Sequence, residues 1–179
     1  MRIAQAGVEV RRADIDDAAA IAEVHVASWR GAYAGLLPAP LLAALSVERH
    51  TVRWREQLAA GNPTTWVALD NGAVVGFASI GRSRDPEPAP AVGELWAIYV
   101  TPNSWGRSAG HALHEAAVAE LGAKYREAVL WVLEGNARAR SFYQAHGWWP
   151  DGAVKTEQRG EALLNEVRYR RRVGPSLNE

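Results

Sequence analysis

Apolar side chains recur every three or four positions in four segments of this chain, a period that predicts helices. The segments are residues 18–33, 41–60, 106–124 and 136–145. An aspartate at position 14 or 16 can cap the first helix, because a carboxylate at a helix start accepts unpaired backbone N–H groups. The residues expected to face the core in the first two helices are Ile21, Val24, Ala27 and Trp29, then Leu42, Leu45, Trp54 and Leu58.

A second set of segments has the alternation, or the continuous apolar run, that is typical of strands. These are residues 8–11, 64–69, 74–80, 94–100, 128–133, 153–156 and 164–169. Asn71-Gly72 predicts a tight hairpin between two of them. The runs 94–100 and 128–133 predict strands buried on both faces, joined by a right-handed helical crossover and therefore parallel. We expect a mixed α/β sheet, antiparallel in its early part and parallel in the middle.

Composition is typical of a single globular domain. The chain has 179 residues, of which 48% are apolar and 22% charged, and this length is about that of one domain. The proline-containing stretch 82–91 predicts an exposed loop but is too short to link two domains. We therefore expect one domain over residues 1–179.

The balance of charges and the lack of cysteine exclude several kinds of function. Twenty Lys and Arg match twenty Asp and Glu, which argues against nucleic acid or a membrane as partner, since both select a basic surface. The absence of Cys excludes disulfides and cysteine nucleophiles. No apolar run approaches the ~20 residues of a membrane span, so a cytoplasmic location is expected by default. We interpret one local cluster as solvated charges at a strand end, namely Arg168, Arg170, Arg171 and Arg172.

The segment 99–111 leaves a buried strand and enters a helix within a few residues. At such a junction, backbone N–H groups point out of the helix end, where the macrodipole is positive. Gly106 and Gly110 would let the main chain approach an anion closely, and Arg107 and Ser108 add a guanidinium and a hydroxyl. This combination suits a pyrophosphate group.

Two common nucleotide motifs do not fit the spacing of this turn. A P-loop requires Gly-Lys before Ser or Thr, and the chain contains no Gly-Lys pair. A dinucleotide fingerprint requires G-x-G-x-x-G, whereas these glycines are four positions apart. A G-x-x-x-G turn also occurs where a helix packs closely on a strand, so the motif alone leaves that structural interpretation open.

The turn resembles motif A of the GNAT superfamily of N-acetyltransferases, Gln/Arg-x-x-Gly-x-Gly/Ala, over residues 105–110. Trp105 stands in place of Gln or Arg and Ser108 in place of the first glycine, while Gly110 keeps the second. The resemblance implies a GNAT-like acyl-CoA N-acyltransferase fold. That fold has a central twisted sheet with splayed, parallel fourth and fifth strands and about four flanking helices.

Other segments carry the same resemblance. Residues 94–100 are similar to the fourth strand of the family, and residues 136–148 resemble its motif B, N-x-x-A-x-x-F-Y-x-x-x-G-F. The stretch 25–33, followed by Leu36-Leu37-Pro38, is similar to a bacterial subgroup of these enzymes. The resemblance thus covers most of the chain and is strongest over residues 94–148.

The resemblance implies contacts with acetyl-CoA as a co-substrate, and no metal. The backbone of Ile98, Tyr99 and Val100 would pair with the pantetheine arm as an added strand does. Asn136 would add hydrogen bonds to the cofactor or its loop, although a plain helix N-cap would use the same residue. The turn expected to hold the diphosphate consists of Trp105, Gly106, Arg107, Ser108, Ala109, Gly110 and His111.

Two residues are candidates for proton transfer. Tyr143, in the motif B frame, would protonate the departing thiolate, since a phenol has a pKa near ~10 and a thiol one near ~8.5; packing beside Phe142 is the structural alternative. Glu94 is the candidate general base, because an ammonium group must lose a proton before it attacks. Alternatively, an ordered water is the base, and Glu94 is a solvent-facing charge at the end of a strand.

Aromatic residues are candidates for the acceptor site. His25, Trp29 and Tyr33 form one stripe on the first helix, which in the family flanks the acceptor; core packing is the other interpretation. Trp96 and Trp131 lie on central strands, where we expect core packing, with Trp96 the better candidate for a site wall. His111 and His114 are three apart, which does not match the four-residue spacing of a zincin helix.

The predicted reaction is direct attack of an amine on the thioester through a tetrahedral intermediate. Two alternatives stay open: a non-catalytic acyl-CoA-binding or regulatory module on the same fold, and a nucleotide-binding protein. The sequence does not specify whether the acceptor is a small-molecule or a peptide amine, nor whether the donor carries a longer acyl group. The oligomeric state is also open, and exposed aromatic residues would favour a homodimer.

Overall fold

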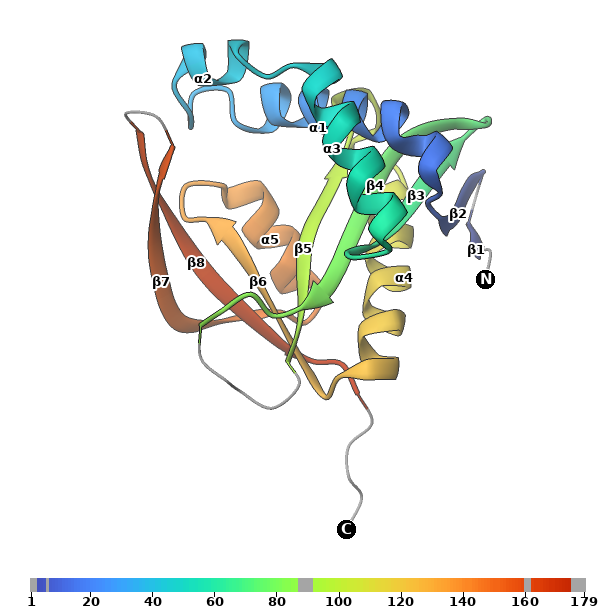
Figure 1. The fold of residues 1–179 in the computed structure, drawn as a ribbon. Helices are drawn as coiled ribbons and strands as arrows, with labels where there is room; N and C mark the ends of the chain where they lie inside the picture. Colours follow the sequence, from blue (N-terminus) through green and yellow to red (C-terminus); the bar gives the residue numbers. More distant parts are fainter. Residues whose placement is uncertain (1–2, 6, 87–91, 160–161, 175–179) are drawn as a thin grey trace.

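The computed structural model describes residues 3–5, 7–86, 92–159 and 162–174, and Figure 1 shows their arrangement. Eight strands form one sheet in the order β1-β2-β3-β4-β5-β6-β8-β7. The early strands pair antiparallel and β5 pairs parallel with β6, which confirms the predicted mixed sheet. The strands are β1 (Ile3–Gln5), β2 (Val8–Arg12), β3 (Thr64–Asp70), β4 (Ala73–Arg82), β5 (Val92–Val100), β6 (Glu127–Leu133), β7 (Trp149–Arg159) and β8 (Ala162–Arg172).

Five α-helices and two short 3-10 turns accompany the sheet in the described residues. The helices are α1 (Ala18–Ala32), α2 (Ala39–Ala43), α3 (Val47–Ala60), α4 (Ala109–Lys124) and α5 (Ala137–Ala145), and the turns are η1 (Ile15–Asp17) and η2 (Pro102–Ser104). Asp14 caps the first turn, and its carboxylate accepts the Asp16 N–H. The predicted single helix over 41–60 is wrong. The Ser46 hydroxyl accepts the Arg49 N–H and starts a new helix.

The helices cover the two faces of the sheet separately (Figure 1). α1 and α3 pack on one face through a core that includes Ile21, Trp54 and Phe77. α4 packs on the opposite face, where Leu113 and Leu121 meet residues from β2 to β6. We call these the α1 face and the α4 face. One predicted core residue is wrong: Ala27 is exposed, because the buried side of α1 turns toward Val26 and Ser28.

β5 and β6 diverge soon after they begin, which opens the sheet at its centre. Their parallel pairing covers three residue pairs, from Val92↔Glu127 to Glu94↔Val129. Beyond these pairs β5 stays attached to β4, whereas β6 stays attached to β8. The two strands therefore form a V whose open end lies beside α1 and α5 (Figure 1).

The turn between β3 and β4 and the C-terminal arginines were both predicted from the sequence. Asn71 and Gly72 both have positive φ, 50° and 81°, as the predicted two-residue hairpin requires. The C-terminal arginines are not simply solvated: Arg168 and Arg170 both pair with Asp151, at 2.9 and 3.1 Å. Of the loop predicted over 82–91, residues 87–91 lie outside the described part. No helix in the described residues is long and apolar enough to span a membrane.

Candidate active site

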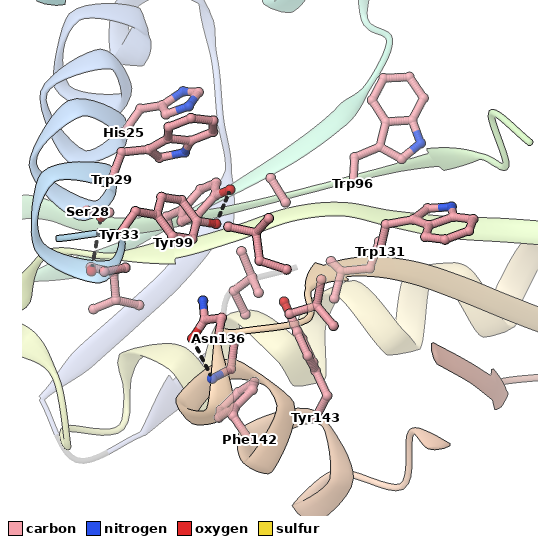
Figure 2. A pocket seen from close by; sticks show the side chains of 18 of the residues that line it. His25, Ser28, Trp29, Tyr33, Trp96, Tyr99, Trp131, Asn136, Phe142 and Tyr143 are labelled. Atoms are coloured by element: carbon pink, nitrogen blue, oxygen red, sulfur yellow. Dashed lines mark hydrogen bonds between the residues drawn. The ribbon is translucent and has the colours of Figure 1, made fainter. Parts of the chain in front are cut away.

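The V between β5 and β6 forms a cleft of about 1050 Å³. Residues from both faces of the sheet line it, and Figure 2 shows part of its wall. Every residue that we predicted for the site lines this cleft, except Ser108 and Ala109. Tertiary structure thus brings together segments that are more than a hundred residues apart in sequence, such as His25 and Tyr143.

The edge of β5 that faces β6 carries main-chain groups available to a ligand. Just past β5, the Thr101 N–H donates to Val75 O at 2.9 Å. Because hydrogen-bonding direction alternates along a strand, Tyr99 also directs its main chain to β4, whereas Ile98 and Val100 direct theirs toward the open side. The open edge of β5 therefore consists of the main chain of Ile98 and the N–H of Val100.

Ser28 is a cleft residue that the sequence analysis missed. The carbonyl of Val100 accepts the Ser28 hydroxyl at 3.0 Å and the Trp105 indole N–H at 2.8 Å. These two bonds fix α1 and the turn after β5 to the end of that strand. The signal in the sequence was a hydroxyl on the apolar stripe of a helix, four residues after Val24.

The turn after β5 presents amides at the start of α4. Gly106 has a φ of 75°, a left-handed conformation that favours glycine. The N–H groups of residues 108–111 have no acceptor within the described part of the chain, as expected for the first turn of a helix. The N–H groups of Trp105 and Arg107 instead close the turn on Pro102 and Ser104.

Gly110 lies in this first helical turn. A Cβ at that position would meet its nearest neighbour at 3.8 Å, an ordinary contact, so helix packing does not require a glycine there. This distance argues against the structural interpretation of the G-x-x-x-G spacing.

Tyr143 stands on α5 with its ring directed into the cleft (Figure 2). Its side chain also packs against Phe142 and Trp148. Burial raises the pKa of Tyr143 well above its ordinary value, and the Tyr99 phenol raises it further. The phenol therefore keeps its proton over the ordinary pH range and can act as a donor.

Asn136 occupies the start of α5. Its side-chain oxygen accepts the Ala139 N–H at 3.1 Å, so it is the helix N-cap. Its NH₂ group makes no hydrogen bond within the described residues and faces the cleft (Figure 2).

Glu94 is buried, with 1% of its side chain exposed. One carboxylate oxygen accepts the Arg84 backbone N–H at 2.8 Å, and the other accepts two N–H groups of the Arg84 guanidinium. The same guanidinium lies over the Trp96 ring, 4.5 Å from its centroid. The interpretation of Glu94 as a solvent-facing charge is therefore wrong.

Trp96 occupies a β-bulge in β5. Ser79 of β4 pairs with Ala97 and Ile80 pairs with Leu95, so the register skips Trp96, whose indole N–H instead donates to Arg82 O at 3.1 Å. The bulge directs the ring onto the α1 face, where it leaves no room for a Cβ on Gly81. Trp131 of β6 lies on the same face, with Lys155 and Arg168 over its ring. Both tryptophans are half-buried and line the cleft, so the expectation of core packing is wrong for both.

The aromatic stripe of α1 forms the opposite wall on the α1 face (Figure 2). The rings of His25 and Tyr99 stack at 5.5 Å, and Trp29 meets Tyr33 edge-on at 5.1 Å. The Tyr33 and Tyr99 hydroxyls are 3.3 Å apart. Burial, followed by the neighbouring Tyr99 phenol, raises the pKa of Tyr33. The stripe thus packs together and also lines the cleft; that it lines the acceptor site stays a prediction.

His111 lies on the α4 side of the cleft, beside a second histidine. His146 Nδ1 donates to the Phe142 carbonyl at 2.7 Å, which leaves its Nε2 to accept from His111 Nδ1 at 2.8 Å. No group of three metal-ligating side chains occurs among the described residues.

Comparison with known proteins adds independent information. A family model described as the acetyltransferase (GNAT) family matches residues 26–148. An uncharacterized N-acetyltransferase of Bacillus subtilis (strain 168), YuaI, is 36% identical over 141 residues, which are 78% of this chain and 79% of that protein.

Solved structures match the fold over almost the whole chain. The PaiA N-acetyltransferase of Thermoplasma acidophilum, in complex with coenzyme A, matches with a TM-score of 0.71 and 19% identity over 92% of this chain and 98% of that one. YncA of Salmonella typhimurium, a putative acetyltransferase with its cofactor acetyl-CoA, matches with a TM-score of 0.70 and 20% identity over 96% and 97%.

Proposed function

This chain belongs to the GNAT family of acetyltransferases and is an N-acetyltransferase, and from that premise we propose that it moves the acetyl group of acetyl-CoA directly onto an amine. One observation carries the proposal: the open edge of β5 leads to the unpaired amides of α4, and a protonated phenol lies at the same cleft. These groups match the three parts of the donor, its amide-containing arm, its diphosphate and its sulfur.

The fit to acetyl-CoA follows from the chemistry of these groups. Ile98 and Val100 offer a strand edge to which the amides of the pantetheine arm can bond. The amides of residues 108–111 favour the negatively charged diphosphate, both by hydrogen bonding and by the helix dipole. The amine reaches the thioester from the α1 face, between the stripe on α1 and Trp96.

The reaction needs three proton movements: the ammonium loses a proton before attack, the attacking nitrogen loses a second one in the tetrahedral intermediate, and the leaving thiolate gains one. The amine nitrogen attacks the carbonyl carbon, and a main-chain N–H at the open edge of β5 stabilises the oxyanion that forms. The carbon–sulfur bond then breaks, and Tyr143 donates its proton to the leaving thiolate, while the second proton of the attacking nitrogen leaves to solvent and solvent returns a proton to Tyr143. The incoming ammonium loses its proton beforehand, and Glu94 is our candidate acceptor, with an ordered water as the alternative.

The test measures free thiol released from acetyl-CoA against a panel of small-molecule and peptide amines. We expect Tyr143→Phe to lower kcat by roughly 100-fold or more, with the Kd for acetyl-CoA unchanged. Tyr125→Phe is the matched control, because Tyr125 loses the same hydroxyl at the far end of α4.

The outcomes separate the candidate functions. A wild-type protein that binds acetyl-CoA but releases thiol with no amine would indicate a non-catalytic acyl-CoA-binding module. Stabilisation by nucleoside triphosphates without stabilisation by coenzyme A would indicate a nucleotide-binding protein. Unchanged kcat in Tyr143→Phe would remove Tyr143 as the acid and leave the transferase activity intact.

The role of Glu94 has a separate test. If Glu94 is the base, Glu94→Gln should lower kcat by roughly 100-fold, because an amide cannot accept the proton. If water is the base, kcat should change little. Arg84 holds both oxygens of this carboxylate, so Arg84→Lys should also change kcat if Glu94 is the base.

A further inference from the structure

A cation–π pair lies in the cleft lining, between the turn after β5 and the start of α5. Trp105 belongs to the turn after β5, and Arg138 belongs to the first turn of α5, which follows β6. The Arg138 guanidinium carbon lies over the Trp105 ring, 3.7 Å from the ring centroid. Both residues line the cleft, so the pair joins the walls built from the two diverging strands.

The Trp105 ring is a fixed support for the guanidinium. Its indole N–H donates to Val100 O, and its far edge lies against α1, where a Cβ on Gly31 would be 3.4 Å from the ring. A cation held on such a ring is already ordered, so less conformational entropy is lost when it binds a ligand.

The guanidinium of Arg138 has no other partner in the described chain. Arg107 of the same turn pairs with Asp70 at 3.3 Å, and Arg140 of the same helix bonds to Tyr169 and to the Glu134 carbonyl. No carboxylate or carbonyl within the described residues accepts from Arg138. Stacking uses the flat face of a guanidinium and leaves its N–H edges free, which is the geometry suited to a phosphate.

Position 105 is also where this chain departs from the pattern that its turn resembles. That pattern has Gln or Arg at the first position, whereas here the position holds an indole. The cation that the turn lacks at 105 is instead supplied from α5, and the indole that replaces it is what supports that cation.

Resting on the proposed function, we infer that Arg138, held on Trp105, is a phosphate-binding residue of this transferase and pairs with a phosphate group of the coenzyme. The amides of α4 supply one side of an anion site, and Arg138 supplies charge from the opposite wall of the cleft. Loss of Arg138 should therefore weaken binding only of donors that carry phosphate.

The test compares two donors by titration calorimetry: acetyl-CoA, and S-acetyl-pantetheine, which has the same arm and thioester but no phosphate. We expect Arg138→Met to weaken acetyl-CoA binding about tenfold, the size of one charge-assisted hydrogen bond. Binding of S-acetyl-pantetheine should be unchanged. Arg126→Met is the matched control, since Arg126 is an exposed arginine at the far end of β6.

A second variant tests whether the charge, and not the shape of the side chain, matters. Adding Trp105→Arg to Arg138→Met places a cation back on the turn and should recover most of the lost acetyl-CoA affinity. Recovery supports the inference, and a double variant no better than Arg138→Met contradicts it.

The remaining outcomes are also decisive. Equal weakening of both donors by Arg138→Met would show a structural role and overturn the inference, as would no weakening of either. A wild-type protein that binds S-acetyl-pantetheine and acetyl-CoA equally well would overturn it while leaving the transferase proposal standing. A wild-type protein that binds neither donor refutes the proposed function itself.

Discussion

The two faces of the cleft are built from different kinds of chemical group. On the α4 face, the ligand-facing groups are main-chain amides and a strand edge, all within residues 98–111, supplemented by Tyr143 and Arg138. On the α1 face, the wall consists of side chains from α1, from the segment after β4, from β5 and from β6. They include His25, Trp29, Arg84, Trp96 and Trp131.

This difference indicates which face of the cleft can accept substitutions without a change in the fold. A main-chain site depends on backbone conformation, and a single short segment can supply it, so it fits one invariant ligand such as a coenzyme. A side-chain site depends on which residues meet in space, and each can change without altering the fold. Under the proposed function, substitutions on the α1 face would therefore be the ones that change the acceptor.

The largest expected effect concerns the buried carboxylate on the α1 face. Glu94 is 1% exposed, whereas the Arg84 side chain is 54% exposed, so Arg84→Met leaves a buried charge without its cation. We expect the free energy of unfolding to fall by about 3 kcal/mol, measured by urea denaturation. Glu94→Gln should cost much less, because the arginine left behind can turn to water. Equal costs for the two variants would contradict this asymmetry.

The next effect concerns the α4 face. Gly110→Asp places a carboxylate among the α4 amides, where it repels the diphosphate, and we expect acetyl-CoA affinity to fall about 100-fold. The helix itself should be no less stable, because an acidic residue in the first turn favours the dipole. Gly110→Asn has nearly the same shape without the charge and should bind acetyl-CoA nearly as well as wild type; a comparable loss there would point to steric exclusion.

A third effect makes the α4 face sensitive to acid. Burial, followed by the nearby positive charges of His146, Arg171 and His111, lowers the pKa of His114 to about 3. The unfolded chain takes up a proton below about pH 6.5 while the folded one does not, so stability is present above pH 6.5 and falls toward pH 3. The loss should reach about 2 kcal/mol at pH 5, measured by thermal unfolding.

His114→Gln is the matched variant for this pH dependence. The Trp148 indole N–H donates to His114 Nε2 at 2.9 Å, and a glutamine oxygen can accept the same bond. The variant should flatten the dependence of stability on pH between 5 and 7. An unchanged slope would assign the acid sensitivity to other groups.

The smallest effect concerns the bond that joins the two faces. Ser28→Ala removes the hydroxyl that α1 donates to Val100 O, and we expect a loss of about 1 kcal/mol in unfolding free energy. The KM for the amine should rise with little change in the Kd for acetyl-CoA, because α1 positions the acceptor wall. A larger effect on acetyl-CoA than on the amine would place Ser28 with the cofactor half instead.

The sequence was most informative where the structure is local. The Asn71-Gly72 hairpin and the parallel strands around α4 follow from short patterns, and the structure confirms them; Asp14 caps the 3-10 turn that leads into α1 and not α1 itself. The break between α2 and α3 was missed, although its cause, the Ser46 cap, is itself a local signal.

The α1 face was the part that the sequence did not predict well. Nothing near Glu94 in sequence identifies Arg84 as its partner, and the bulge that redirects Trp96 depends on the register between β4 and β5. The continuously apolar strand predicts that Trp131 is a core residue. The divergence of β5 and β6 instead exposes Trp131 to the cleft.

The sequence by itself determined most of the elements and the turn from β5 into α4, because caps, periodicity and a glycine turn act over a few residues. Tertiary structure alone decided which side chains meet across the V, including Arg138 on Trp105 and Arg84 on Glu94. The physical reason is that a main-chain site is set by the local path of one segment. A side-chain contact between segments depends on strand order and register, which long-range packing fixes.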